Sequence, residues 1–266
     1  MPEVIAPYPP GTPCWVDLIV PDQPAALDFY HQLFGWTGEI GPPEYGGYAV
    51  CSLKGKPVAG IMARPQAPED QAVPTAAWTT YLASADADGT ARSVTDNGGV
   101  VLMPPTEVPA MGRMLIAADP AGAAFGVWQA LEFFGSRVVN EPGSLVWSEL
   151  NTTDPEAAAA FYPRAIGIGV APMEGIPGYH GLDVNGRVVG GMQQIGDDFP
   201  PGTPPHWLPY FSVGGTDATV DTLVKAGGGT IRPAFDMPAG RMAVVHDQQG
   251  AVFAIIDATG PEPDWG

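Results

Sequence analysis

Two short segments of the chain place an acidic residue two positions after a tryptophan. Trp15-Val16-Asp17-Leu18 lies in the first half and Trp147-Ser148-Glu149-Leu150 in the second. Both segments have the composition of a β-strand, in which residues two apart share a face. An acid in an apolar cavity has a raised pKa and can act as a general base. Asp17 and Glu149 are therefore the first candidates for catalysis.

Each of these residues also has plainer roles. Asp17 and Glu149 can form structural ion pairs with Arg113 and Arg241, or accept a hydrogen bond from a bound ligand. The two tryptophans line a pocket if they point into a cavity, and otherwise fill the core. The sequence leaves these alternatives open.

A second strand in each half adds polar and aromatic groups to the same inward surface. Residues 78–83 contribute Thr79 and Tyr81, and the corresponding strand contributes His206, Leu208 and Tyr210. Each tyrosine can donate a hydrogen bond to a ligand carbonyl or cap the core. His206 is the only histidine at a predicted inward strand position, and its counterpart Ala77 makes the two cavities chemically unequal.

These patterns predict one set of site residues. The candidate catalytic residues are Asp17, Glu149 and His206. The candidate ligand-binding residues are Trp15, Tyr48, Thr79, Tyr81, Met103, Arg113, Trp128, Trp147, Tyr179, Leu208 and Tyr210.

The site residues recur because the whole chain is an internal duplication. Phe29-Tyr30 corresponds to Phe161-Tyr162, and Gly112-Arg113-Met114 corresponds to Gly240-Arg241-Met242. Ordered matches of this kind across a chain indicate repeated structural units. We expect one domain over residues 10–135 and a second over residues 140–259, joined near Glu141-Pro142.

Each half contains the same order of elements twice. An extended segment precedes a helix, which Asp22 or Asp154 is suited to cap, and short strands follow. The sequence thus predicts an α+β fold of four βαβββ modules with curved mixed sheets. Pro-rich segments at 104–109 and 233–238 are expected to be loops, either covering a cavity mouth or lying on the surface.

This order of elements, with Asp-x-x-x-Ala-x-x-Phe-Tyr in the first helix and Asp-Pro-x-Gly before the last strand, resembles the vicinal oxygen chelate superfamily of glyoxalases, bleomycin-resistance proteins and extradiol dioxygenases. More narrowly, the chain resembles a two-domain actinobacterial group of glyoxalase-like proteins and "hydroxylases", through Gly11-Thr12-Pro13 to Leu18 and the Gly-Arg-Met strand. The residues that carry the superfamily match are Asp22, Phe29, Tyr30, Gly35, Gly98, Gly99, Asp119, Pro120 and Gly122, then Asp154, Phe161, Tyr162, Gly167, Gly227, Gly228, Asp247 and Gly250.

The resemblance implies where a metal would be bound. The positions that hold ligands in the superfamily's metal enzymes fall on Trp15 and Trp147, Thr79 and Leu208, Gly126 and Ala254, and near Ala59-Gly60 and Gly190-Gly191. Divalent metals need imidazole, carboxylate or thiolate donors. We therefore expect no metal site and no cofactor, although the glyoxalase and dioxygenase reactions of this fold use a metal.

An aromatic cavity without a metal suits a flat, largely apolar ligand. The first hypothesis is a protein that binds a small aromatic or polyketide-like molecule, for resistance or as an accessory in natural-product biosynthesis. The alternatives are a metal-independent isomerase, cyclase or lyase, and a glyoxalase-like detoxification lyase, so enzymatic activity is left open. Genomic neighbours would help to separate these hypotheses.

The bulk composition excludes several classes of partner. The 266 residues carry a net charge of −18, which disfavours nucleic acid and anionic membrane surfaces. We see neither a long apolar segment nor a signal peptide and expect a cytoplasmic protein, either monomer or homodimer. Cys14 and Cys51 lack metal-site spacing and are expected to be reduced and buried.

Overall fold

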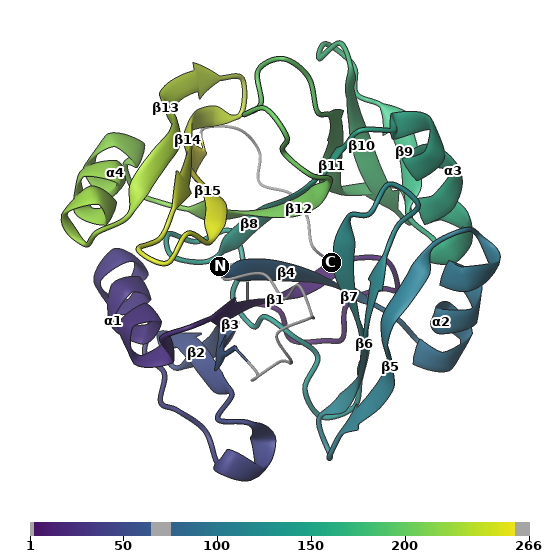
Figure 1. The fold of residues 1–266 in the computed structure, drawn as a ribbon, viewed down its shortest axis with the longest axis horizontal. Helices are drawn as coiled ribbons and strands as arrows, with labels where there is room; N and C mark the ends of the chain where they lie inside the picture. The colour runs from purple at the N-terminus through teal and green to yellow at the C-terminus, as the bar shows by residue number, and fades with distance from the viewer. Residues whose placement is uncertain (1–2, 65–75, 259–266) are drawn as a thin grey trace.

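The structure is a computed structural model that describes residues 3–64 and 76–258. Each half forms one mixed sheet, and the helices lie on the outside of the two sheets (Figure 1). The α+β fold and the tandem pair of domains predicted from the sequence are confirmed. Residue 259, the predicted end of the second domain, lies outside the described residues.

The first half forms a seven-stranded sheet in the order β2-β3-β1-β4-β7-β6-β5. Its elements are β1 (Pro13–Val20), α1 (Gln23–Phe34), the 3₁₀ turn η1 (Pro43–Tyr45), β2 (Ala49–Leu53), β3 (Lys56–Ala63), β4 (Ala77–Ala83), α2 (Ala87–Asp96), β5 (Val100–Val108), β6 (Gly112–Ala118) and β7 (Ala124–Ala130).

The second half forms an eight-stranded sheet in the order β13-β14-β15-β12-β8-β11-β10-β9. Its elements are β8 (Leu145–Thr152), α3 (Pro155–Ala165), β9 (Gly169–Pro172), β10 (Tyr179–Val184), β11 (Arg187–Gln194), β12 (His206–Ser212), α4 (Thr216–Lys225), β13 (Gly229–Met237), β14 (Gly240–His246) and β15 (Val252–Ala258).

The first module departs from its repeats in one strand. Among the described residues, the counterpart of β9 is reduced to a single bridge between Thr37 and Ser52, followed by η1. Pro42 and Pro43 lie in this segment, and proline cannot donate a backbone hydrogen bond to a neighbouring strand.

The helices begin and end where the sequence predicts. The Asp22 and Asp154 side chains accept hydrogen bonds from the backbone N–H groups of Ala25 and Ala157, at 3.0 and 2.9 Å. Gly35 ends α1 in the left-handed conformation with φ of 72°, which glycine adopts without steric cost. These caps determine the residues at which α1 and α3 begin and at which α1 ends.

The two segments expected to be Pro-rich loops are strands, and that expectation was wrong. Residues 104–108 lie in β5 and residues 233–237 in β13, which are edge strands of their sheets. The pairing register shifts between Met103 and Thr106 and between Arg232 and Phe235, where the prolines lie. Edge strands and bulges tolerate proline because no partner strand needs its missing N–H.

The two halves share their hydrophobic core. Tyr30, Phe34 and Trp36 of the first half pack against Phe211 and Phe253 of the second. In Figure 1, α1 lies beside α4 and α2 beside α3, so each helix pair joins the two halves. The predicted boundary between residues 10–135 and 140–259 thus separates the two repeats. Each of two hydrophobic clusters nevertheless contains residues of both halves.

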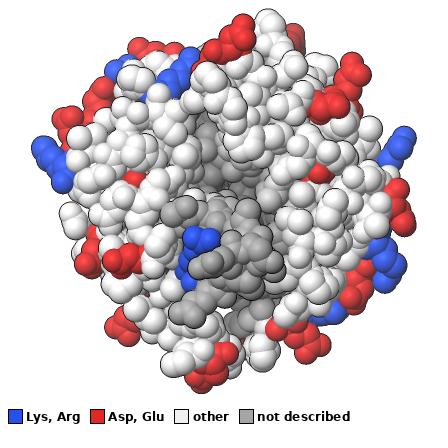
Figure 2. All heavy atoms as spheres, in the orientation of Figure 1, with Lys and Arg blue, Asp and Glu red and all other residues white. Residues whose placement is uncertain are grey.

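The charged side chains in Figure 2 lie mainly around the margin of the face shown. Among the described residues, no helix has the length and apolar character needed to cross a membrane. Both cysteines are buried, as expected.

Candidate functional site

The first candidate cluster is centred on Asp17, on the face of the sheet that the helices do not cover. Valines and leucines on the opposite face of β1 pack under α1, which turns Trp15 and Asp17 away from the helix. The Tyr81 hydroxyl donates a hydrogen bond to Asp17 Oδ2 at 2.9 Å, and Tyr48 Oη lies 3.4 Å from the same oxygen. Trp15 Nε1 donates to Tyr48 Oη at 2.8 Å. The indole, both phenols and the acid thus form one connected cluster.

The second half repeats this cluster around Glu149. Tyr179 and Tyr210 donate to its two carboxyl oxygens at 2.8 and 2.9 Å. Trp147 Nε1 donates to Tyr179 Oη at 3.0 Å. Gln193 Nε2 adds a third donor to Glu149, at 2.9 Å, which the first half lacks.

The two acids differ in how completely they are hydrogen bonded. Asp17 and Glu149 are only 4% and 3% exposed, and burial raises the pKa of both carboxyls. Both oxygens of Glu149 accept hydrogen bonds, which favour its charged form. Asp17 Oδ1 has no hydrogen-bond partner among the described residues, and the pKa of this acid rises to about 7. Asp17 therefore combines a buried carboxyl oxygen without a hydrogen bond with a pKa near neutral.

Three glycines make room for the tyrosines of these clusters. A Cβ atom at Gly60 would lie 1.8 Å from Tyr48 Oη, and one at Gly191 would lie 1.9 Å from Tyr179 Oη. At Gly126 it would lie 2.2 Å from the Tyr81 ring. Real Cβ atoms do not approach other heavy atoms so closely. A residue with a side chain at any of these glycine positions would therefore displace the tyrosine ring beside it.

The open side of the first cluster is covered by a segment that the sequence analysis missed. The Phe133 ring packs edge-on against Trp15, with ring centroids 4.9 Å apart, and lies near Trp128 as well. Trp128 Nε1 fixes it by donating to the Phe133 carbonyl at 2.7 Å. Trp15 is consequently only 4% exposed, whereas Trp147 is half-buried. The only hint in the sequence was an aromatic pair directly after a predicted strand.

A row of polar side chains continues outward from Glu149. Gln193 Nε2 also donates to Asn151 Oδ1 at 2.9 Å, and Asn151 Nδ2 lies 3.4 Å from His206 Nε2. His206 Nδ1 lies 2.8 Å from the Pro204 carbonyl, which can only accept, so this nitrogen carries the proton. Burial lowers the pKa of His206, which favours the neutral ring with a lone pair on Nε2. Strand alternation predicts Asn151 on the inward face with Trp147 and Glu149, although not as a site residue. Gln193, on β11 opposite Asn151, was not predicted.

The arginines do not pair with these acids, so that alternative was wrong. Arg113 lies on the helix-covered face of β6 and pairs with Asp88 of α2. Arg241 pairs with Asp217 and Asp236. The position of Arg113 follows from strand alternation, because Arg113 shares a face of β6 with the core residue Leu115. The structure does not place Arg113 with the other predicted ligand-binding residues.

The remaining predicted residues lie on the uncovered face. Thr79 lies opposite Asp17 in the β1–β4 pairing, and Leu208 lies opposite Glu149 in the β8–β12 pairing. Met103, half-buried in β5, lies opposite Ile116, and Trp128 lies opposite Met114. No bound molecule tests their roles, so ligand contact stays a prediction.

The donors needed for the superfamily's metal are missing from the positions that would hold it. Trp15, Thr79 and Gly126, and their counterparts Trp147, Leu208 and Ala254, offer no imidazole, carboxylate or thiolate. Within residues 3–64 and 76–258, no group of three or more His, Cys, Asp or Glu side chains is placed to hold a metal ion. The donor set therefore does not fit a divalent metal.

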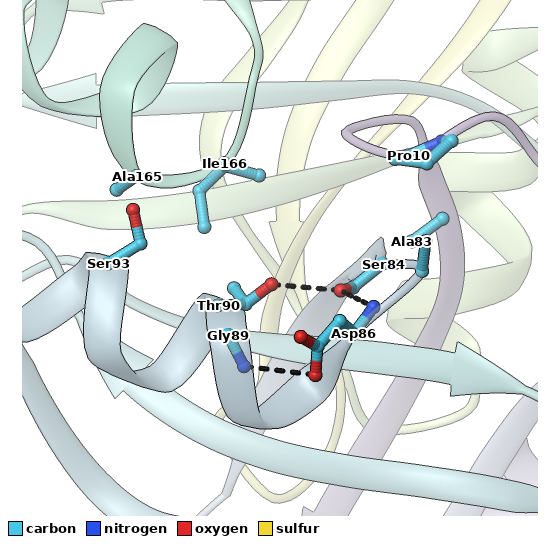
Figure 3. Close-up of a pocket in the computed structure, with 10 residues that line it drawn as sticks. Pro10, Ala83, Ser84, Asp86, Gly89, Thr90, Ser93, Ala165 and Ile166 are labelled. Carbon is cyan, nitrogen blue, oxygen red and sulfur yellow. Dashed lines mark hydrogen bonds between the residues drawn. The ribbon is translucent and has the colours of Figure 1, made fainter.

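Two surface hollows lie away from the clusters. One, of about 310 Å³, lies between the start of α2 and the end of α3 (Figure 3). Ser84 Oγ and Thr90 Oγ1 lie 2.8 Å apart on its wall and satisfy each other, and Asp86 caps α2. The other, of about 450 Å³, lies beside β9 and β10. Neither is lined by Asp17, Glu149 or their partners.

Known proteins are similar to this chain in sequence and in fold. The family model described as Glyoxalase/Bleomycin resistance protein/Dioxygenase superfamily matches residues 14–127 and again 137–255. The "Putative glyoxylase CFP32" of Mycobacterium tuberculosis is 41% identical over 254 residues, covering 94% of this chain and 95% of that protein. The "Anthracycline biosynthesis protein DnrV" of Streptomyces peucetius is 39% identical over 264 residues, covering 94% of both.

The fold is also that of a Mn(II)-bound glyoxalase from Novosphingobium aromaticivorans. The TM-score is 0.66 at 16% identity, over 96% of this chain and 85% of the other. Two family matches, one in each half, agree with the two repeated sheets. The chain belongs to the Glyoxalase/Bleomycin resistance protein/Dioxygenase superfamily.

Proposed function

We propose that this protein binds a small, largely apolar aromatic molecule without a metal ion, as part of natural-product biosynthesis. The observation that carries the proposal is the cluster of an indole, two phenols and a buried carboxyl in each half, beside metal positions that hold no donor. Indole and phenol rings offer large, rigid surfaces on which a flat ligand stacks. The biosynthetic setting is supported by the name of the relative DnrV.

Binding can be tested with the full-length protein stripped of metal by a chelator. Isothermal titration with a panel of planar aromatic compounds should give saturable binding, and aliphatic compounds of equal size should not bind. Trp147→Ala should weaken this binding, because it removes a half-buried ring from the uncovered face. Binding that appears only after a divalent metal is added would contradict the proposal.

The environment of Asp17 supports a second candidate, a metal-independent isomerase, cyclase or lyase. Its Oδ1 atom is buried without a partner, and the pKa of about 7 lets it accept and return a proton. The proposed step breaks a C–H bond next to a ligand carbonyl. The proton moves to Oδ1, the electron pair forms the enolate, and the proton then returns to a carbon of the ligand.

Proton abstraction can be measured without knowing the natural substrate. In D₂O, the protein should catalyse exchange of the acidic C–H protons of 2-tetralone, followed by NMR. Asp17→Asn should abolish the added exchange, and Asp88→Asn, which changes an acid on the helix-covered face, should not. Equal exchange rates in wild type and Asp17→Asn would remove Asp17 from such a mechanism.

A further inference from the structure

The two uncovered faces differ most in the row of side chains beyond the acid. In the second half this row is Gln193, Asn151 and His206. The equivalent positions of the first half are occupied by Met62, Ile19 and Ala77. Both halves contain an acid and two tyrosines, so these three residues do not explain why only the second half has polar side chains in this row.

The row is not needed to satisfy the carboxyl. Tyr179 and Tyr210 already donate one hydrogen bond to each carboxyl oxygen of Glu149. Burying amide and imidazole groups is unfavourable unless they form hydrogen bonds. Asn151 is fully buried, while Gln193 and His206 are half-buried at the outer end of the row. The hydrogen bonds within the row offset the burial of Asn151, and the half-buried Gln193 and His206 leave its outer end accessible.

The hydrogen bonds within the row determine what its outer atoms offer. Gln193 Nε2 uses both of its hydrogens, on Glu149 and Asn151, so the oxygen Oε1 is left to accept. Within residues 3–64 and 76–258, no side chain or backbone group donates to that oxygen. His206 Nε2 accepts only a long hydrogen bond from Asn151 Nδ2, at 3.4 Å. The outer end of the row thus offers one free acceptor, Gln193 Oε1, and one weakly bonded acceptor, His206 Nε2.

The surrounding groups disfavour three alternative ligand groups. Glu149 carries negative charge when ionised and repels a carboxylate placed beside it. A carbonyl oxygen or an ether can only accept, so neither can hydrogen bond to Gln193 Oε1 or to the Nε2 lone pair. A hydroxyl group donates, and satisfies either acceptor.

We propose that Gln193 and His206 are specificity-determining residues, which accept hydrogen bonds from the hydroxyl group of a neutral, hydroxylated planar aromatic ligand bound in the second half. This assignment rests on the proposed function, since it names the class of aromatic ligand and the half that holds it. Half-buried Trp147 and Tyr179 lie on the same face as the row and supply ring surface. Phe133 covers the corresponding tryptophan of the first half.

The assignment can be tested with three probes that differ in one group, namely 2-naphthol, 2-methoxynaphthalene and 2-naphthoate. Titration of the metal-free wild-type protein should show 2-naphthol binding at least about tenfold more tightly than the other two. Gln193→Met and His206→Ala, which introduce the first half's residues, should each reduce that preference, and the double variant should remove most of it. The affinity for 2-methoxynaphthalene should change by less than about threefold.

Controls separate this assignment from the function on which it rests. Met62→Gln places the same amide at the equivalent position of the first half and should leave all three affinities unchanged. Thermal unfolding of each variant identifies any that fails to fold, and Gln193→Leu then provides a second test, because it also removes the acceptor oxygen and adds no charge. Equal binding of naphthol and its methyl ether, or an unchanged preference in the variants, would overturn the assignment alone. Failure of both neutral probes to bind would overturn the proposed function as well.

Discussion

The Tyr30 hydroxyl, in the first helix of the first half, donates a 3.0 Å hydrogen bond to Asp247 Oδ2, in a turn of the second half. The repeat reverses the arrangement, since Tyr162 of the second half donates to Asp119 Oδ2 of the first at 3.1 Å. The other carboxyl oxygen of each aspartate accepts two backbone N–H groups of its own turn. Each helix is thereby tied to the strand-connecting turn of the opposite half.

Tyr30→Phe and Tyr162→Phe should each destabilise the protein by about 1–3 kcal/mol, because a buried carboxyl oxygen loses its donor. Urea unfolding followed by circular dichroism measures this difference. Both variants should unfold in a single transition, since the cores are shared between the halves. Tyr45→Phe is the matched control, because Tyr45 is 55% exposed and should have almost no effect. Separate transitions for the two halves would contradict the shared core.

Gly191→Ala should destabilise the protein by about 1–3 kcal/mol, as expected for overpacking. The new methyl group needs the space of Tyr179 Oη, so the phenol must leave Glu149 and Trp147. In a Tyr179→Ala background the same change should cost much less, which a double-mutant cycle measures. Gly169→Ala is the control, because its Cβ would have no neighbour closer than 3.5 Å. Equal costs in both backgrounds would show that the glycine does not serve the tyrosine.

The stability of the protein should fall as the pH rises from 3.8 to about 7, with Asp17 as one cause. The pKa of this carboxyl is 3.8 in its ordinary state and about 7 in the folded chain. Between these values the folded chain binds the extra proton, so raising the pH favours unfolding by up to about 1.4 kcal/mol per unit. Above the folded pKa this contribution is constant.

Asp17→Asn should reduce that slope, because an amide does not titrate. Urea unfolding at a series of pH values compares the variant with wild type. Parallel curves for the two proteins would show that Asp17 titrates normally and that its burial does not govern its charge.

Adding Ni²⁺, Zn²⁺ or Mn²⁺ to the metal-free protein should neither raise its melting temperature nor produce glyoxalase activity on the hemithioacetal of methylglyoxal. The reason is the donor set, which has indole, hydroxyl and hydrogen where ligands would have to be. A metal ion that binds the folded protein, present at a free concentration of 100 times its Kd, would stabilise the fold by about 2.7 kcal/mol. Differential scanning calorimetry detects such a shift. Such a shift, with activity restored, would contradict the proposal.

Much of the fold could be predicted because local chemistry determines it. Asp22 and Asp154 cap their helices whatever the tertiary context, and alternation along β1 and β8 correctly turned Asp17 and Glu149 to one face. The same alternation places Arg113 with Leu115 on the covered face, so the predicted pairing of Arg113 with Asp17 was wrong.

Other features depend on contacts between distant segments. The closure of the first face by Phe133 comes from a chain reversal after β7, in which its amide hydrogen bonds to Met111. The reciprocal bonds of Tyr30 and Tyr162 require both halves to be docked. The prolines of β5 and β13 suggested loops, and only the position of these strands at sheet edges explains why they pair.

The most direct test of the central claim is a crystal structure of the metal-free protein bound to 2-naphthol. The ring is predicted to lie against Trp147 on the uncovered face of the second half, with its hydroxyl within hydrogen-bond distance of Gln193 Oε1 or His206 Nε2 and no metal between them. A ring bound in the hollow beside Ser84 and Thr90, or one held through a metal ion, would contradict the account.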